Sequence, residues 1–441
     1  MTPKEFLFQV KYRCYRRQAF GFYAALRNSQ FWSADQWIDY QIKKRKELVL
    51  TAFLTTPFYG KFYGDVGFQI EDVDQKDFFE KLPVLTKQHV RDFYNELINP
   101  KLESFLAVSS TGGSTGIPTR FGYDRRYPAE SLSWRMMEWW KIAPWDDGAY
   151  VWRNRRSKFH KRLFNEMLWW PTRKIRLDAS SMDLSNMAAF IDALNTIQPP
   201  LLQGYVGAIA ELAQFVVETG CLSHHPKAVW LTSAPIVSVQ RRQIENTFCA
   251  PVYDQYGCCE APNIAAQCGK QMGLHVNAES LSLEFVDEAN NPVPAGEWGK
   301  ALISKFDDFV FPLIRYEVGD VGRYLAEPCP CGRSLPVIDR VKGRTTDIIR
   351  LPSGRVLSGE YLTTIFDSCP DAVNGFRVTQ RKDLSLLIEY IPVGDIAREQ
   401  AVQAVKAQLE ADVGYEVPVN FVKVVSLAHD RGKQRFVVKE I

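Results

Sequence analysis

Several features are missing from this 441-residue sequence, and each absence excludes a class of protein. No stretch approaches the roughly 18 apolar residues that a membrane-spanning helix needs, so we expect no transmembrane segment. The first twenty residues include basic side chains but no continuous apolar core followed by a small-residue cleavage site, which a secretory signal requires. We therefore expect a cytoplasmic protein.

A strong excess of charge of one sign is also absent. The chain has 54 Lys and Arg against 51 Asp and Glu, a net charge of +3, whereas a nucleic-acid-binding protein usually has a basic patch or a large basic excess. Internal repeats and low-complexity tracts are missing as well, and 46% hydrophobic with 24% charged residues is an ordinary globular composition. We expect a small-molecule substrate and no nucleic-acid partner.

The nine cysteines do not indicate a disulfide framework, because their number is odd and several gather near a histidine. Cys268 precedes His275 in QCGKQMGLH, and Cys329 and Cys331 lie in CPCGR. Three thiols and one imidazole make a closed tetrahedral set that suits structural zinc. The alternative is that they are free thiols in the core, and Cys258 is a possible competing ligand.

The order of the expected elements predicts an α/β fold. The first hundred residues look helical, and Ser33 is placed to cap a helix that ends before Pro57. Short apolar runs then alternate with longer amphipathic ones, which is typical of strands alternating with helices. The strongest of these are PPLLQGYVGAIAELAQFVVETG (199–220), AVWLTSAP (228–235) and VSVQRRQIENTF (237–248).

At about residue 281 the sequence pattern changes, and strand-rich segments separated by turns follow. A compact tail follows residue 341. The tail mixes the strand-like FRVTQ, LSLLIEYI and VNFVKVVSL with the helical IAREQAVQAVKAQLEADVG. We predict a large domain over 1–341, with a helical region over about 1–100, and a small domain over 342–441.

Residues 109–119 read SSTGGSTGIPT, and this composition has two interpretations. Glycine lets the backbone come close to a ligand, the hydroxyls donate hydrogen bonds, and successive N–H groups can form a nest for phosphate oxygens. The stretch is not a Walker loop, because no Gly-Lys-Ser/Thr closes it. A flexible linker is the alternative, since Ser/Gly-rich segments commonly have that role.

Four further motifs follow in order along the chain. VYDQYGCCEAP (252–262) places an aromatic residue, a glycine and a carboxylate just past a strand; IRYEVGDVGRY (314–324) has an Asp between small residues; KGRTTDIIR (342–350) has an Arg, and RGKQRF (431–436) has a Lys. Each motif alone is weak. Together, in this order and spacing, they resemble the adenylate-forming acyl-CoA ligase superfamily, specifically its phenylacetate-CoA ligase and capsule-biosynthesis branch.

The resemblance extends from about residue 30 to the C-terminus and implies both a fold and a reaction. The fold is a large N-terminal adenylate-forming domain of mixed sheets and helices, followed by a small mobile α+β domain. The reaction uses ATP and Mg²⁺ to adenylate an aryl or other small carboxylic acid, and then transfers the acyl group to CoA or a carrier-protein thiol. Transfer to an amine acceptor is an alternative, and a non-catalytic nucleotide-binding relative is another.

The resemblance also implies roles for residues of the first two motifs. Glu260 would hold Mg²⁺, and Cys259 stands where the family commonly has a Thr beside the α-phosphate. Tyr256, next to Gly257, would stack on adenine. Asp320 would accept hydrogen bonds from both ribose hydroxyls.

The last two motifs supply the remaining groups of the implied site. Arg344 has a fixed fork of donors that suits ribose and phosphate oxygens. Lys433 would reach the carboxylate and the α-phosphate during adenylation, and the alternative is a surface lysine near the terminus. The small domain of the family swings about a hinge, and Thr346 stands where this branch usually has an Asp.

Three other parts of the chain receive roles from the same resemblance. Gly204 and Tyr205 would line the acid-binding pocket, and Ala234 lies in the adenine-contacting loop. The Cys/His set would hold structural zinc, as in part of this branch. The family's usual Lys after the loop Pro is replaced by Thr119. The residues that would close over the β- and γ-phosphates of ATP are Ser110, Thr111, Gly112, Gly113, Ser114, Thr115 and Gly116.

One segment stays outside the implied site. Residues 152–170, WRNRRSKFHKRLFNEMLWW, are basic with interleaved aromatics. A solvated helix face is the first interpretation, and a site for an anionic acceptor or a membrane surface is the second.

Overall fold

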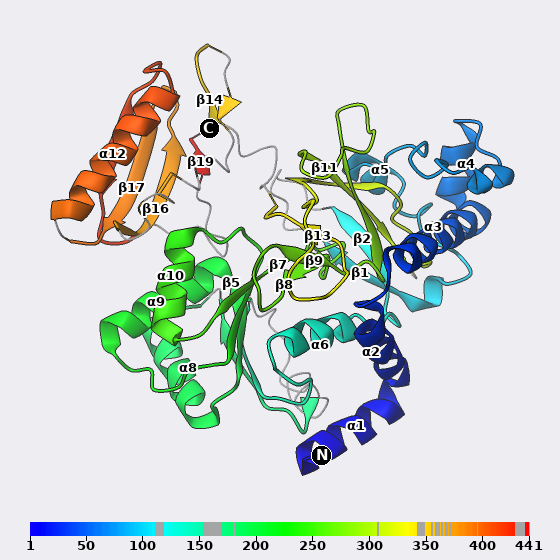
Figure 1. Ribbon diagram of the computed structural model, residues 1–441, viewed down its shortest axis with the longest axis horizontal. Helices are drawn as coiled ribbons and strands as arrows, with labels where there is room; N and C mark the ends of the chain where they lie inside the picture. Colours follow the sequence, from blue (N-terminus) through cyan, green and yellow to red (C-terminus); the bar gives the residue numbers. More distant parts are fainter. Residues whose placement is uncertain are drawn as a thin grey trace. The chain divides into compact units, whose positions relative to one another are not determined.

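The structure of the protein is a computed structural model (Figure 1). It describes residues 1–110, 119–152, 169–179, 181–306, 308–341, 349–353, 356–357, 362, 365–366, 369, 372–394, 396–427 and 437–440. The contacts divide the chain into two compact units: unit 1 is Met1–Phe8, Trp140–Asp254 and Lys342–Ile441, and unit 2 is Gln9–Trp139 and Gln255–Val341. The predicted α/β class is confirmed, and the domain boundary at residue 341 stays a prediction.

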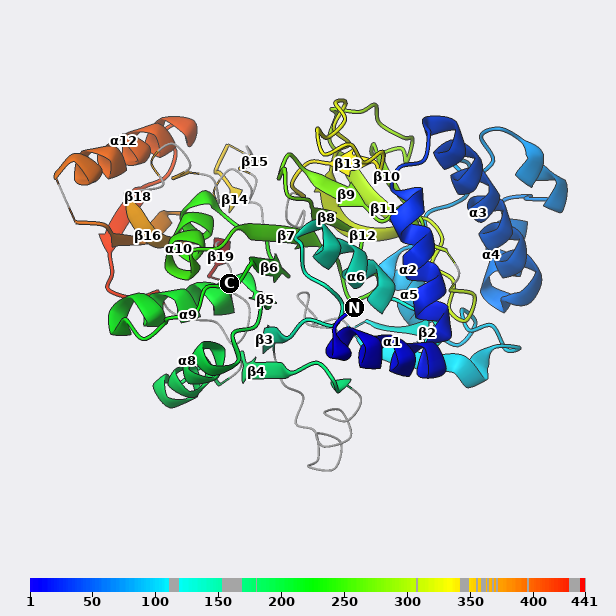
Figure 2. The same ribbon diagram turned by 60° about the horizontal axis from the view of Figure 1, so that its bottom comes forward.

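Unit 1 contains a parallel sheet with the strand order β7-β6-β5-β3-β4 (Figure 2). Its strands are β3 (Gly148–Trp152), β4 (Lys174–Asp178), β5 (Leu201–Tyr205), β6 (Ala228–Thr232) and the first residues of β7 (Val252–Tyr256). Every residue of β6 is buried, as expected of a strand covered on both faces.

Helices cross between the strands of this sheet, as the alternating pattern predicts. They are α8 (Leu184–Ile197), α9 (Val206–Thr219) and α10 (Ser238–Phe248). α9 begins directly after β5 and ends at Gly220, whose φ of +62° is the left-handed conformation that terminates helices. The predicted strand–helix pair at 199–220, the strand at 228–235 and the helix at 237–248 are confirmed.

The tail of unit 1 has its own four-stranded sheet, and its apolar core also includes Val237 and Val239 at the start of α10. The strand order is β18-β17-β16-β19, and one helix and a short strand pair complete the part that the structure describes. The apolar core includes Phe366, Phe376, Ile388 and Leu409. The elements are β14 (Ile349–Arg350), β15 (Val356–Leu357), β16 (Val373–Gln380), β17 (Leu386–Pro392), α12 (Ile396–Asp412), β18 (Val419–Lys423) and β19 (Val437–Lys439).

Unit 2 begins with the predicted helical region. The best defined start is that of α3, where Ser33 accepts from the backbone N–H of Gln36 and the Gln36 side chain accepts from the Ser33 N–H, a complete capping box. Pro57 follows the end of α3 and occupies the first turn of α4, where its missing N–H is harmless. The helices are α1 (Pro3–Tyr15, begun in unit 1), α2 (Arg17–Ser29), α3 (Ala34–Thr55), α4 (Pro57–Gly64), η1 (Ile70–Asp74), α5 (Lys87–Asp92), η2 (Glu103–Phe105) and α6 (Glu130–Trp139).

The strands of unit 2 form three groups. A hairpin pairs β1 (Leu106–Ser110) with β2 (Arg120–Asp124), and an antiparallel sheet has the order β10-β11-β12. β8, β9 and β13 form a third antiparallel set, in which β8 pairs with the last residues of β7. The remaining bounds are β8 (Ala265–Gln267), β9 (Leu274–Val276), β10 (Leu281–Val286), β11 (Gly299–Lys305), β12 (Tyr316–Gly322) and β13 (Val337–Ile338).

None of the helices in the described part of the chain is both long and apolar enough to span a bilayer.

Candidate nucleotide site and cysteine–histidine cluster

The Ser/Thr/Gly loop begins and ends on neighbouring strands. Ser110 is the last residue of β1 and pairs in register with Arg120, the first residue of β2. Thr111 to Gly116 lie outside the described residues, and the pairing places the flanking residues Ser110 and Arg120 opposite each other. A segment that returns to the adjacent strand connects a hairpin, so the structure does not support a linker between domains. The phosphate-binding role of Ser110 and the loop stays a prediction.

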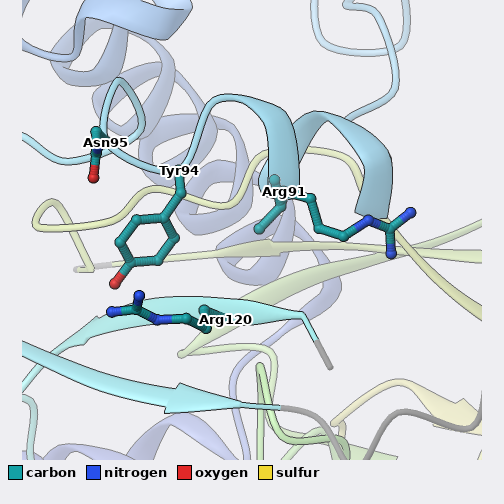
Figure 3. A pocket seen from close by; sticks show the side chains of 5 residues that line it. Arg91, Tyr94, Asn95 and Arg120 are labelled. Atoms are coloured by element: carbon teal, nitrogen blue, oxygen red, sulfur yellow. The ribbon is translucent and has the colours of Figure 1, made fainter. Parts of the chain in front are cut away.

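A depression of about 310 Å³ lies beside this hairpin (Figure 3). It is lined by Val90, Arg91, Tyr94, Asn95 and Arg120. The Arg120 guanidinium lies 5.1 Å from the centre of the Tyr94 ring, while the Arg91 side chain extends in a different direction (Figure 3). The sequence analysis missed both arginines, because neither belongs to a recognisable motif.

The turn after β7 presents the residues of the first motif. A side chain on Gly257 would place its Cβ 2.1 Å from the Pro262 carbonyl oxygen, so only glycine fits there. The Cys258 backbone N–H donates to the Ala261 carbonyl at 3.0 Å, which closes the turn. Cys259 is exposed and Glu260 is buried. The turn therefore separates an accessible thiol from an inward carboxylate.

Tyr256 and Asp320 come together although 64 positions separate them in the sequence. The Tyr256 hydroxyl donates to Oδ2 of Asp320 at 3.0 Å. Burial, followed by the charge of Asp320, raises the pKa of Tyr256 well above its ordinary value, so the hydroxyl keeps its proton and remains the donor. Gly319, which precedes Asp320, has a φ of +90°. This conformation changes the direction of β12 just before Asp320.

A second tyrosine holds the candidate magnesium ligand. The Tyr316 hydroxyl donates to Oε1 of Glu260 at 2.7 Å, and both side chains are buried. Burial and then the Glu260 carboxylate raise the pKa of Tyr316, so it too is a permanent donor. Sequence analysis missed Tyr316. The signal was its position four residues before Asp320 on the same strand.

The predicted substrate residues lie in unit 1, at the carboxyl ends of parallel strands, where ligands of such sheets bind. Gly204 and Tyr205 end β5, and Tyr205 is the N-cap of α9. A Cβ on Gly204 would lie 2.9 Å from the Val151 carbonyl oxygen, so close packing already requires this glycine. Ala234 follows β6 and packs against the core of this sheet. Their contact with a substrate or with adenine stays a prediction.

The four predicted zinc ligands gather in unit 2. The ligand atoms of Cys268, His275, Cys329 and Cys331 all lie within 4.8 Å of one another. The Cys268 and Cys329 sulfurs are 3.7 Å apart, and the Cys331 sulfur is 3.3 Å from Nε2 of His275. Cys258 is not part of this group.

This donor set fits zinc. Sulfur ligands 2.3 Å from a tetrahedral zinc ion lie about 3.8 Å apart, close to the 3.7 Å between Cys268 and Cys329. Burial lowers the pKa of His275 to about 4, so the imidazole is in its neutral, metal-binding form near pH 7. Four protein ligands leave no open position, which is the arrangement of a structural site.

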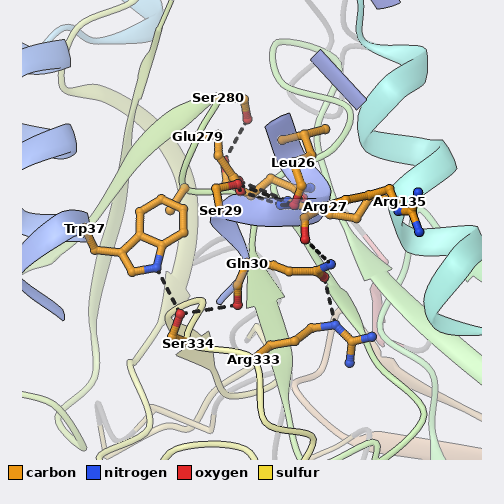
Figure 4. Close-up of polar contacts among 12 residues, drawn as sticks. Leu26, Arg27, Ser29, Gln30, Trp37, Arg135, Glu279, Ser280, Arg333 and Ser334 are labelled. Atoms are coloured by element: carbon orange, nitrogen blue, oxygen red, sulfur yellow. Dashed lines mark hydrogen bonds and ion pairs between the residues drawn. The ribbon is translucent and has the colours of Figure 1, made fainter. Parts of the chain in front are cut away.

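The cysteine-containing loop after β12 is fastened to the end of α2 (Figure 4). Oε1 of Gln30 accepts from Nε of Arg333 and from Nε1 of Trp139, each at 2.9 Å. The Gln30 carbonyl accepts from the Ser334 backbone N–H at 2.9 Å, and Trp37 donates to the Ser334 hydroxyl at 3.3 Å. Residues far apart in sequence thus hold the loop that supplies two of the thiols.

Arg344, Thr346 and Lys433 lie outside the described residues, as do residues 153–168 of the basic aromatic segment. The chain on either side of Lys433 is described: Leu427 is buried, and β19 pairs with β16 through Val437 and Val378. The assignments of Arg344, Thr346 and Lys433 stay predictions.

Known proteins are similar to this chain at low sequence identity over most of its length. No family model matches the sequence. The chain is 24% identical over 374 residues to Protein CapK of Staphylococcus aureus, which covers 82% of this chain and 80% of that protein. It is 22% identical over 363 residues to the phenylacetate-coenzyme A ligase of Thermus thermophilus, covering 78% of each.

The structural comparison covers nearly the whole chain. A crystal structure of 2-hydroxyisobutyryl-CoA ligase, in the postadenylation state with R3-HIB-AMP, matches with a TM-score of 0.77 and 20% identity over 94% of this chain and 93% of that one. The fold is therefore that of adenylate-forming CoA ligases. The predicted resemblance to the adenylate-forming superfamily, and within it to the phenylacetate-CoA ligase-like branch, is confirmed.

Proposed function

We propose that the protein is an ATP-dependent, AMP-forming ligase that adenylates a small carboxylic acid and transfers the acyl group to CoA or a carrier-protein thiol. The observation that carries the proposal is the pairing of Tyr256 with Asp320 beside the buried Glu260. The similarity to proteins named phenylacetate-CoA ligase supports the choice of reaction.

The chemistry explains why these residue types are needed. A carboxylate is a poor electrophile, because its leaving group would be oxide; a mixed anhydride with AMP has a stable phosphate as its leaving group instead. Forming that anhydride brings two anions together, so charge neutralisation is the main requirement. Asp320 suits the ribose hydroxyls as an acceptor, and Lys433 would supply positive charge at the reacting carboxylate.

Glu260 is the proposed magnesium ligand. Mg²⁺ prefers oxygen ligands and typically binds one or two carboxylates together with substrate phosphates, and Glu260 is a buried carboxylate held by Tyr316. When bound, the ion would supply charge neutralisation at the phosphates of ATP. Glu260 contributes a carboxylate whose orientation is fixed before the nucleotide arrives.

The proposed structural metal is zinc, held by Cys268, His275, Cys329 and Cys331. The fit of the sulfur and nitrogen positions to a tetrahedron supports it. We assign this site no part in the reaction, since a catalytic zinc keeps an open position.

The test of adenylation is acid-dependent exchange of labelled pyrophosphate into ATP, across aryl, fatty and amino acids. We expect exchange with one class of acid and its loss in the Asp320→Ala variant. ATP binding is measured in parallel by calorimetry. A wild-type protein that binds no ATP and exchanges no pyrophosphate would contradict the proposal.

The acceptor is tested separately, because thiol and amine transfer share the adenylation step. Once the acid is known, AMP release is measured with CoA and with a panel of amines. We expect CoA to accelerate AMP release and to yield a thioester. Acceleration by an amine alone, with an amide product, would favour the alternative of amide formation.

A further inference from the structure

Arg91 is tied to the end of the Ser/Thr/Gly loop. Its Nη1 donates to the hydroxyl of Thr119 at 3.2 Å, and its Nη2 donates to Oε1 of Gln88 at 2.6 Å. Thr119 is buried and is the last residue of the SSTGGSTGIPT stretch. A cationic side chain therefore stands where the predicted phosphate-binding loop joins β2.

The charge of Arg91 is not neutralised by a carboxylate within the described ranges. Its two described hydrogen-bond acceptors, the Thr119 hydroxyl and the Gln88 amide, are both neutral. A half-buried guanidinium without an anionic partner retains its full affinity for an anion. Its planar fork of donors matches phosphate oxygens.

The segment that carries Arg91 is fastened to the strand that carries Asp320. Leu85 forms a parallel β-bridge with Tyr316, the first residue of β12. It donates to the carbonyl of Arg315, just before the strand, at 3.1 Å and accepts from the Glu317 N–H at 2.9 Å. Lys87, in the first turn of α5, donates to the Val318 carbonyl at 2.6 Å. α5 is thus held against β12, the strand that carries Asp320 of the proposed nucleotide site.

The helix that carries Arg91 contacts both strands of this region. α5 packs against β2, which begins directly after Thr119, and against β12, which carries Tyr316 and Asp320. Tyr316 is the residue that holds Glu260. Arg91 therefore lies on the element between the end of the loop and the strand whose tyrosine holds the candidate magnesium ligand.

We propose that Arg91 binds the terminal phosphates of ATP and stabilises the pyrophosphate that leaves during adenylation. The inference rests on the proposed function. Negative charge builds on the bridging oxygen and the β-phosphate as the bond to the α-phosphate breaks, and a fixed guanidinium stabilises it. The Thr119 hydroxyl accepts from Nη1 of Arg91 and so holds the guanidinium at the end of the loop.

The test compares ligands that differ only in the terminal phosphates. Arg91→Gln should weaken the binding of ATP and of inorganic pyrophosphate by about tenfold or more, the effect expected for a lost charged hydrogen bond. AMP binding should change by less than about twofold, since AMP lacks those phosphates. Arg91→Lys keeps the charge and should fall between wild type and Arg91→Gln. Calorimetric titration of the full-length protein measures all three ligands.

The chain offers a matched control in Arg125. It is an exposed arginine just after β2 that does not line the depression, and its guanidinium lies 6.0 Å from the centre of the Phe105 ring, so Arg125→Gln should leave the ATP-to-AMP affinity ratio unchanged. Equal weakening of ATP and AMP by Arg91→Gln, or no change for ATP, overturns the inference. Acid-dependent exchange by the wild type would show that the proposed function survives either result.

Discussion

At the residue scale, the most informative contact is that between Tyr316 and Glu260. A buried carboxylate is held by one hydroxyl at 2.7 Å, and Phe in place of Tyr removes that hydroxyl with little change of volume. Tyr316→Phe should lower stability by about 1–3 kcal/mol, because a buried acceptor loses a donor. It should also raise the Mg²⁺ concentration needed for half-maximal exchange.

The Mg²⁺ dependence separates a positioning role from a structural one. Tyr324→Phe is the control, since the Tyr324 hydroxyl donates to the Leu283 carbonyl at 2.9 Å elsewhere in the same unit. This control should lose stability without a change in the Mg²⁺ requirement. If both variants show the same Mg²⁺ requirement as wild type, Tyr316 does not position Glu260.

Asp320 gives a second prediction at this scale. Asp320→Ala removes the proposed acceptor of the ribose hydroxyls and should weaken ATP and AMP binding alike by roughly 1.5–3 kcal/mol. Asp287→Ala, at an exposed carboxylate of the same unit, should leave both affinities at the wild-type value. An unchanged AMP affinity in Asp320→Ala would remove this residue from the nucleotide site.

At the scale of elements, the loop between β12 and β13 depends on the cysteine–histidine cluster. Cys331→Ser should abolish the binding of one zinc ion per chain and lower stability by more than about 2 kcal/mol, because structural zinc binding contributes directly to folding. Elemental analysis and thermal unfolding measure the two effects. Cys14→Ser, at an exposed thiol outside the cluster, should change neither. Zinc-free protein from a chelator-free preparation contradicts the assignment.

The sequence predicts elements well where the signal is local. Ser33 and Gln36 form the cap that starts α3, and the alternation over 199–248 gives β5, α9, β6 and α10 in order. Turn glycines and strand patterning act over a few residues, so they are readable without the fold.

Contacts between distant segments could not be predicted in the same way. Arg91 meets Thr119 across 28 positions, and Gln30 meets Arg333 across 303. Neither contact has a motif, since the first depends on how α5 packs against β2 and the second on how the loop after β12 packs against the end of α2. The resemblance supplied Asp320, Glu260 and Tyr256, but Tyr316 and the hydrogen bonds that the two tyrosines donate to the carboxylates depend on the fold.

At the scale of the whole molecule, the large domain is predicted to bind ATP and the tail to supply the lysine used in adenylation. A substitution of that lysine tests this difference in role. Lys433→Ala should reduce acyl-adenylate formation by orders of magnitude and leave ATP affinity near the wild-type value, because this lysine is assigned to the reacting carboxylate and α-phosphate. Lys423→Ala is the control, since Lys423 on β18 is paired with Glu399 in the same tail. Adenylate formation at the wild-type rate in Lys433→Ala contradicts the assignment.

Both units are assembled from separated stretches of the chain: unit 2 needs Gln9–Trp139 together with Gln255–Val341, and unit 1 needs its first eight residues, its middle and its tail. During synthesis, unit 2 cannot complete its core until residue 341 has left the ribosome, and unit 1 must wait for the tail. The nascent chain therefore exposes unfinished apolar surface for most of its translation. Its yield in a cell should depend on chaperones that shield such surface.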